Sequence, residues 1–188
     1  MITSLLLAAD RAATPWKNGG GVTREIAAWP VGSGLEDFDW RLSMAEVVAP
    51  GAFSLFPEVD RILTVLDGTL SLTFGDGRVA FLDGQSAPLA FAGDRPCHGV
   101  PVGGPVQDLN LMCRRGRFRG RVESVDDVAW RPSGEVAFLV ALEPLGVGAE
   151  SLNRFDALGF TDIDPDAAPA FHVGGRAIAV ALTPTEVP

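Results

Sequence analysis

The sequence predicts an all-β protein, and three observations support this prediction. Glycine and proline occur 22 and 14 times in 188 residues, and they interrupt the chain at short intervals. Amphipathic stretches long enough for a helix are scarce, and short apolar runs lie between the interruptions. Apolar and charged fractions of 47% and 21% are typical of a globular domain. Short strands joined by closely spaced turns are what a β-sandwich or barrel requires.

The first half of the chain contains the clearest strands. Strands are predicted over Thr23–Trp29 and Trp40–Val48, because both segments have a strand-like composition. The dipeptide Asp-Gly at 67–68 lies between two β-rich runs and is a strong turn signal. We therefore predict a β-hairpin that joins residues 61–66 to residues 69–74.

A second hairpin is predicted directly after the first. Gly-Asp-Gly at 75–77 separates the preceding strand from residues 78–82, and a further Asp-Gly pair closes this segment. Three more apolar or alternating runs continue the sheet pattern, over residues 89–91, 106–113 and 117–122.

The second half of the chain contains two nearly continuous apolar runs. Residues 136–142 and 177–182 are expected to be strands buried on both faces. Between them, Glu150–Leu158 is the best candidate for a short helix, with Ser151 as its cap residue. The acidic, proline-bearing stretch Asp162–Pro169 is expected to be a loop.

Charge and hydropathy exclude several function classes. A net charge of −9 argues against a nucleic-acid partner, although residues 114–121 contain a run of arginines. No segment approaches the length of a membrane span, and the N-terminal apolar run is too short for a signal peptide. We therefore expect a cytoplasmic protein with no nucleic-acid or membrane partner.

The residues that usually bind metals or act as nucleophiles are few. Cys97 and Cys113 make neither a disulfide framework nor a zinc motif, and His98 and His172 are the only histidines. Cys97 and His98 are adjacent, so in a strand they point to opposite faces, which disfavours a thiolate–imidazole pair. We therefore expect no metal and no cofactor, and nothing in the sequence demands an enzyme.

The segment Thr-Pro-Trp-Lys-Asn-Gly-Gly-Gly at residues 14–21 is the most informative in the chain. It combines a large ring in Trp16, a cation in Lys17, an amide in Asn18 and a glycine backbone that can approach a ligand closely. Such a set is suited to holding an anionic small molecule. The alternative is a glycine-rich turn before a strand, with Trp16 in the core.

Two further segments carry polar residues beside strongly apolar ones. In residues 53–61, Asp60 and Arg61 adjoin a predicted strand, and either can point into the barrel or form a structural ion pair. In residues 103–112, Asp108 and Asn110 alternate with leucines. If that face lines a cavity, both become ligand anchors or partners of the cations, whereas on a solvated face they are ordinary surface residues.

Together these segments resemble the HutD/Ves family over essentially the whole chain. The resemblance is carried by residues 14–26, by Phe-Ser-x-Phe-Pro-x-x-Asp-Arg at 53–61, and by Gly-Pro-x-x-Asp-Leu-Asn-x-Met at 104–112. It implies a single bicupin domain over 1–188, with two β-barrel lobes at about 1–122 and 123–188; exchange of strands between the lobes stays open. It also implies a link to bacterial histidine utilisation or, in the Ves branch, to stress. Cupins often pair through edge strands, so a homodimer is a further expectation.

The cupin resemblance permits a test of the metal question. A metal-binding cupin carries His-x-His followed by a glutamate and, six residues later, a glycine. Counting back from Gly68 places Arg61 at the glutamate position, with Phe56 and Ser54 at the two histidine positions. A cation at this position repels a metal ion and favours a carboxylate, which an arginine binds with two charge-assisted hydrogen bonds.

The leading hypothesis is a metal-free cupin that binds a small anionic metabolite of histidine degradation, such as urocanate or N-formylglutamate, as a sensor or regulator. Its expected ligand-binding residues are Trp16, Lys17, Asn18, Gly19, Gly20, Arg61, Asp108 and Asn110.

Two alternatives stay open. The first is a metal-independent isomerase or hydrolase for the same ligands, with Glu25, His98 or Asp108 as acid–base groups. The second is an interaction protein whose barrels are filled with side chains.

Overall fold

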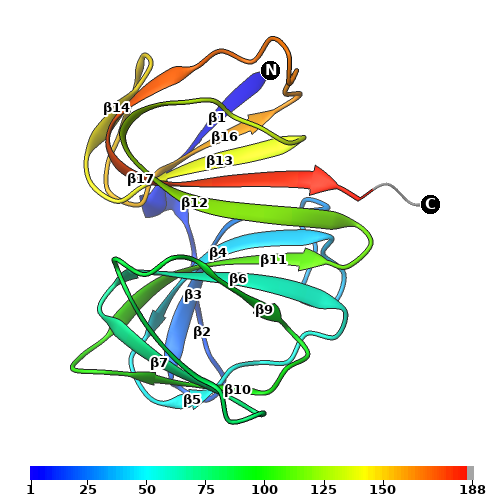
Figure 1. Cartoon of the computed structure of the whole chain (residues 1–188), viewed down its shortest axis with the longest axis vertical. Coiled ribbons are helices and arrows are strands. Elements are labelled where there is room, and N and C mark those ends of the chain that lie inside the picture. Colours follow the sequence, from blue (N-terminus) through cyan, green and yellow to red (C-terminus); the bar gives the residue numbers. More distant parts are fainter. Residues whose placement is uncertain (186–188) are drawn as a thin grey trace. The chain divides into compact units, whose positions relative to one another are not determined.

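The computed structural model describes residues 1–185, and nearly every regular element in them is a strand (Figure 1). The single short helix among them is the 3₁₀ turn η1 at Ala8–Asp10. The expectation of an all-β chain is therefore confirmed. None of the described helices has the length and apolar character to cross a membrane.

The chain divides into two compact units, which are described separately. The central unit comprises Ala12–Arg117, and the terminal unit comprises Met1–Arg11 together with the chain from Phe118 onward. The assignment of these units to cupin barrels stays a prediction.

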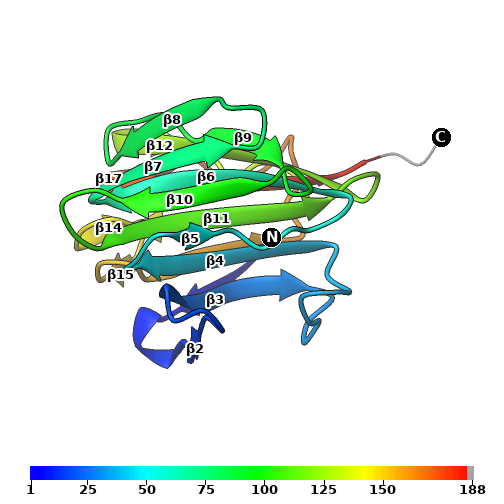
Figure 2. The same cartoon turned by 90° about the horizontal axis from the view of Figure 1, so that it is seen from below.

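The central unit contains two antiparallel sheets (Figure 2). The six-stranded sheet has the order β2-β3-β4-β11-β6-β9, and the four-stranded sheet has the order β5-β10-β7-β8. The strands of the first are β2 Ala13–Pro15, β3 Gly21–Trp29, β4 Trp40–Val47, β11 Val106–Arg114, β6 Val59–Asp67 and β9 Leu89–Ala92. Those of the second are β5 Gly51–Ala52, β10 Cys97–Pro101, β7 Thr69–Phe74 and β8 Val79–Asp83.

The two predicted hairpins have different outcomes. The second is confirmed, because β7 and β8 pair antiparallel around residues 75–77. The first prediction was wrong: β6 pairs with β11 and β9, whereas β7 pairs with β10 and β8 in the other sheet. Asp67 still belongs to β6, and Gly68 alone separates the two strands. One residue cannot supply a two-residue hairpin turn, and Gly68, at φ 82°, instead redirects the chain between sheets.

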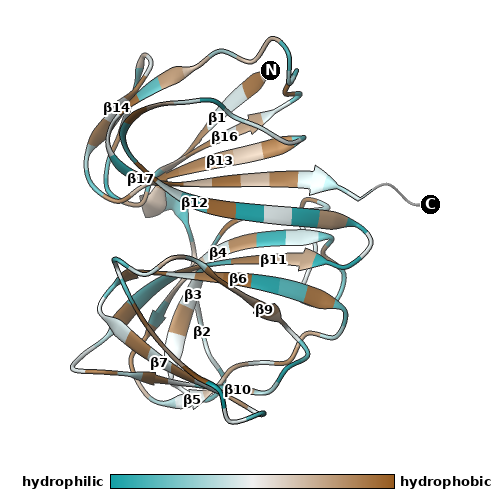
Figure 3. Cartoon of the chain, in the orientation of Figure 1, coloured by the Kyte–Doolittle hydropathy of each residue, from teal (hydrophilic) through white to brown (hydrophobic). Residues whose placement is uncertain are grey.

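The terminal unit contains one seven-stranded sheet of order β1-β16-β13-β17-β14-β15, to which β12 adds by pairing with β17. Its strands are β1 Ile2–Leu6, β12 Phe118–Trp130, β13 Val136–Ala141, β14 Leu145–Val147, β15 Glu150–Leu152, β16 Ala157–Thr161 and β17 Phe171–Pro184. The two predicted apolar strands are confirmed as β13 and the middle of β17, which pair with each other. Brown tones mark the apolar residues along them in Figure 3.

The predicted helix over Glu150–Leu158 was wrong. Residues 150–152 form β15, and a tight turn then leads into β16. In this turn the backbone N–H of Asn153 donates to the Asp156 carboxylate at 2.9 Å, and Phe155 has φ 71°. A left-handed residue at this place is incompatible with a continuous right-handed helix.

Candidate functional site

The central unit contains a cavity of about 690 Å³. Its floor is the six-stranded sheet, from which β3, β4 and β11 contribute alternate side chains and β6 contributes Arg61. Trp16, Phe53 and Phe56 line it as well, together with residues 33–35 of the loop after β3. The volume lies in the range of small-molecule sites, which are mostly apolar with a few polar groups.

Strand register places the polar side chains of the floor in rows. Asn110 on β11 lies opposite Ser43 on β4, and Ser43 lies opposite Glu25 on β3. In the next row, Met112 lies opposite both Arg41 and Arg61. Because neighbouring strands are about 4.8 Å apart, the backbones at the two arginines are roughly 10 Å apart. The sheet therefore presents two guanidinium groups at separate positions of one cavity.

Arg61 is the buried cation of the cavity, with 6% of its surface exposed. Its Nε and Nη2 atoms both donate to Asn110 Oδ1 at 3.3 Å, and its Nη1 donates to the Ser54 carbonyl at 3.5 Å. The rings of Phe53, Phe56 and Phe91 lie 5.2 to 5.7 Å from its guanidinium carbon. Burial lowers the pKa of Arg61 to about 10, although nearby Asp108 and Cys97 act in the opposite direction.

Arg61 donates only to neutral acceptors within the described part of the chain, where no carboxylate lies within 4 Å of it. At 3.3 to 3.5 Å these bonds are long compared with those between a guanidinium and a carboxylate, which are usually 2.7 to 2.9 Å. The guanidinium therefore retains capacity for an anionic partner in the cavity.

Asp108 also lines the cavity and is 2% exposed. Burial raises the pKa of its carboxyl group to about 7, and the charge of Arg61 lowers it in part. Its register partners are Ala45 and Val65, whose side chains offer no hydrogen bond. Near neutral pH, this carboxyl group therefore exists in both protonation states.

Arg41 differs from Arg61 because it is already neutralised. Its Nε donates to Glu25 Oε2 at 2.7 Å, and its Nη1 lies 3.5 Å from Ser43 Oγ. All three side chains line the cavity. They present a neutral ion pair, which suits hydrogen bonding to a ligand better than attraction of a second net charge.

Trp16 lines the cavity and is fixed by local contacts. Its Nε1 donates to Thr23 Oγ1 at 2.8 Å, and its ring meets that of Phe53 edge-on at 6.2 Å. Gly21 is required beside this ring, because a Cβ atom there would lie 2.4 Å from the Glu46 carbonyl oxygen and 3.1 Å from the ring. One glycine thus permits close packing between the loop and β4.

The other predicted residues of this segment divide into two groups. Lys17 and Asn18 line the cavity, with Lys17 exposed to solvent. Gly19 and Gly20 do not line it, and their amides are used inside the turn. Gly19 N donates to the Trp16 carbonyl at 3.0 Å, and Gly20 N donates to Asn18 Oδ1 at 3.0 Å. These glycines shape the loop and do not present amides to the cavity.

The candidate acid–base residues also divide. Glu25 and Asp108 line the cavity, whereas His98 does not. On β10, Cys97 is buried and His98 is exposed, so the prediction that they face opposite sides is confirmed. His172 is an exposed residue of β17.

Sequence reasoning missed Arg41, Ser43 and Phe53 as cavity residues. The alternation of Arg41, Ser43 and Ala45 with apolar residues was available as a signal. The pairing of Arg41 with Glu25 depends on β3 and β4 lying side by side, and β3 contains a bulge between Glu25 and Ala27 that sets the register. This local irregularity cannot be read from composition.

The cupin metal positions do not fit a metal ion. Ser54, Phe56 and Arg61 all line the cavity, and together they offer a cation instead of a set of ligands. Within residues 1–185, no group of three histidine, cysteine, aspartate or glutamate side chains is arranged to hold a metal ion.

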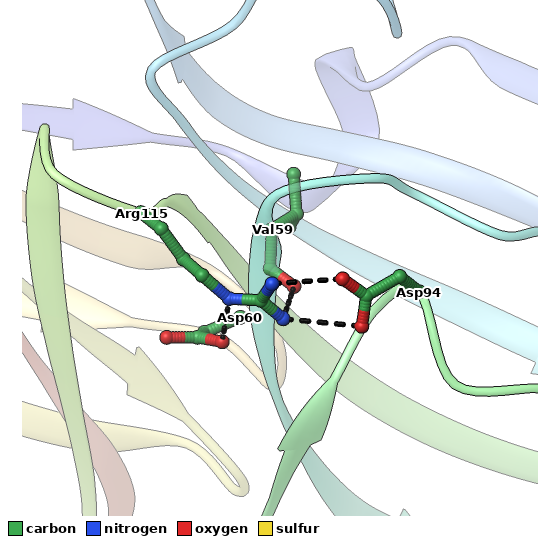
Figure 4. Close-up of polar contacts among 4 residues, drawn as sticks. All are labelled: Val59, Asp60, Asp94 and Arg115. Carbon is green, nitrogen blue, oxygen red and sulfur yellow. Dashed lines mark hydrogen bonds and ion pairs between the residues drawn. The ribbon is translucent and has the colours of Figure 1, made fainter.

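A cluster of charged residues around Arg115 lies near the start of β6, outside the cavity (Figure 4). Arg115 Nε donates to Asp60 at 2.7 Å, and its Nη1 and Nη2 atoms donate to the two Asp94 oxygens at 2.7 and 3.2 Å. Asp60 thus turns away from the cavity, while its neighbour Arg61 points into it. The possible Asp60–Arg61 ion pair is replaced by this external network.

Several known proteins are similar to this chain. The HutD family model matches residues 8–164. An uncharacterised 21.2 kDa protein from the hutC 3′ region of Pseudomonas putida is 41% identical over 65% of this chain and 64% of its own length. Protein Ves of Cronobacter sakazakii is 38% identical over 59% and 60%, respectively. The chain therefore spans less than two thirds of the length of these curated relatives.

A solved structure extends the similarity to nearly the whole chain. HutD from Pseudomonas fluorescens SBW25, determined in a formate condition, is 32% identical with a TM-score of 0.86, covering 98% of this chain and 100% of that one. The relatives associate this family with the histidine-utilisation locus. With a family model that matches most of its length, this chain belongs to the HutD family.

Proposed function

We propose that the central unit binds a small anionic metabolite of histidine degradation, of the urocanate or N-formylglutamate type, and acts as a sensor or regulator of that pathway. The observation that carries this proposal is Arg61, a buried guanidinium that faces a cavity and donates only to neutral acceptors in residues 1–185. A ligand carboxylate would replace these with shorter bonds between two charged groups, worth about 1.5–3 kcal/mol each.

The other cavity residues have complementary roles in this proposal. Trp16 and Phe53 form an apolar wall suited to a planar ligand. Asn110 orients the Arg61 guanidinium through Oδ1, and exposed Lys17 attracts anions toward the opening. The association of the family with the histidine-utilisation locus supports this choice of ligand class.

Thermal-shift titration with urocanate, N-formylglutamate and formate tests the proposal. A ligand at 100 times its dissociation constant should add about 2.7 kcal/mol of stability. Arg61→Ala should abolish the shift, whereas Arg115→Ala, which removes an arginine outside the cavity, should retain it. Absence of a shift with every carboxylate at millimolar concentration would refute the proposal, as would an equal shift in Arg61→Ala.

One observation favours a second function, a metal-independent isomerase or hydrolase acting on the same carboxylates. Asp108 is a cavity carboxyl group whose pKa is raised to about 7 by burial. General acid–base catalysis is most effective when the pKa of the catalytic group lies near the operating pH. Incubation of each bound carboxylate followed by product analysis separates the two functions. Turnover that is lost in Asp108→Asn would establish the enzyme, and unchanged ligand would favour the sensor.

A further inference from the structure

Asp108 is a buried acidic group whose ionisation depends on the charge of Arg61, so anion binding by Arg61 affects it directly. It lines the cavity from the same face of β11 as Asn110, the residue that contacts Arg61. Burial raises the pKa of Asp108 and the charge of Arg61 lowers it, and no hydrogen bond contributes to the shift. A buried carboxylate without hydrogen bonds is costly to ionise unless a nearby cation compensates it.

An anion on Arg61 would remove that compensation. The ligand carboxylate and the Asp108 carboxylate would share one cation, and like charges that share a site do not both stay ionised. Protonation relieves the conflict. It also converts one Asp108 oxygen from an acceptor into an O–H donor, which can bond to the ligand.

We propose that Asp108 is protonated when the site is occupied and donates a hydrogen bond to the anion held by Arg61, so that the ionised Asp108 carboxylate takes up a proton when the anion binds. This inference rests on the proposed function. It makes Asp108 a specificity-determining residue, because its O–H selects a ligand that accepts a hydrogen bond. It also makes occupancy of the site depend on pH.

The other charged groups around the cavity have to be separated from this effect. They are Lys17 before β3, Glu25 on β3, Arg41 on β4 and Arg61 on β6, with the Cys97 thiol on β10 near Arg61. Glu25 is already paired with Arg41 at 2.7 Å. Burial raises the pKa of Asp108 to about 7 in the free protein, which sets the pH range in which proton uptake begins.

Calorimetric titration with formate and with N-formylglutamate tests the inference, since the carboxyl groups of both probes stay ionised from pH 6.5 to 8.5. Measurements in two buffers of different ionisation enthalpy report the number of protons taken up. We expect this number to approach one above pH 7, with the dissociation constant rising up to about tenfold per pH unit. Asp108→Asn keeps a donor, so it should bind without proton uptake and with little pH dependence.

Asp60→Asn is the matched control, because it makes the same substitution at a carboxylate outside the cavity, and it should keep wild-type proton uptake. Binding without proton uptake in the wild type would overturn the inference and leave the proposed function standing. No binding of either probe would overturn both. Should Asp108→Asn not fold, infrared difference spectra of the wild type at pH 8 decide: a protonated-carboxyl band must appear when the probe binds.

Discussion

The two units are both built from antiparallel strands around a buried apolar cluster, but the central unit also has a cavity lined by charged side chains. In the terminal unit, Trp130, Phe160 and Phe171 pack with ring centroids 5.5 and 5.6 Å apart, within a cluster that is otherwise aliphatic. In the central unit, Arg61 and Asp108 face a cavity of about 690 Å³. A shared strand architecture therefore does not dictate a shared role. The identity of the inward-facing side chains distinguishes a packed core from a candidate binding site.

The difference also has an energetic meaning. Filling an interior with large apolar side chains stabilises a unit, whereas burying a cation and an acid with few hydrogen bonds costs free energy. We therefore expect substitutions in the terminal unit to act mainly on stability. Those in the cavity should act mainly on binding and on the pH dependence of stability.

The largest effect is expected in the packed interior. Phe160 is fully buried between two aromatic neighbours, so Phe160→Ala should lower the free energy of unfolding by about 3–5 kcal/mol. Phe56→Ala in the central unit is the matched comparison, and it should cost less because Phe56 already borders the cavity. Guanidinium unfolding of both variants measures the difference, and equal losses would contradict the contrast between the units.

An effect that depends on pH is expected at Asp108. Because its folded pKa is raised from 3.8 to about 7, the folded protein binds an extra proton between these values. The stability it contributes is complete below about pH 4 and is lost as the pH rises through 7. Relative to the wild type, Asp108→Asn should therefore gain stability between pH 4 and 8, by up to about 4 kcal/mol at 1.36 kcal/mol per pKa unit.

Urea unfolding at several pH values measures this change. Asp60→Asn serves as the control, since its carboxylate lies outside the cavity in an ion pair with Arg115. A difference between Asp108→Asn and the wild type that stays constant with pH would show that Asp108 keeps its charge on folding.

The smallest effect is expected at the external arginine. Arg115 pairs with Asp60 and Asp94, but its side chain is 38% exposed, and exposed ion pairs contribute about 0–1 kcal/mol each. Arg115→Ala should therefore lower stability by roughly 1 kcal/mol, with a smaller loss at high salt, and should leave carboxylate binding unchanged. A larger loss that persists at 1 M salt would mean that the side chain stabilises the protein by packing instead of charge.

Much of the local structure was predictable because strand alternation is a property of the sequence. The pattern in residues 106–113 placed Asp108, Asn110 and Met112 on one face, and all three line the cavity. The turn at 75–77 was also predictable, because a glycine-rich turn between adjacent strands needs no distant partner. These features depend on a backbone period of two and on short-range geometry.

Other features depended on contacts that are distant in sequence. Gly68 resembles part of a hairpin turn, yet β6 takes β11 as its partner, so strand pairing overrides the local turn signal. Residues 150–158 resemble a helix, but pairing of β15 with β14 and the Asp156 turn favour strands. In both cases hydrogen bonds supplied by other segments outweigh weak local preferences.

The sequence by itself determined an all-β chain, the shared face of Asp108, Asn110 and Met112, and the family to which the chain belongs. Only the tertiary structure decided which of the arginine side chains stay available to bind an anion. Arg41 is neutralised by Glu25 and Arg115 by Asp60 and Asp94, whereas the partners of Arg61 within the described residues are neutral. The physical reason is that charge compensation acts over a few ångströms between side chains that strand pairing brings together, and this proximity is not written in residue order.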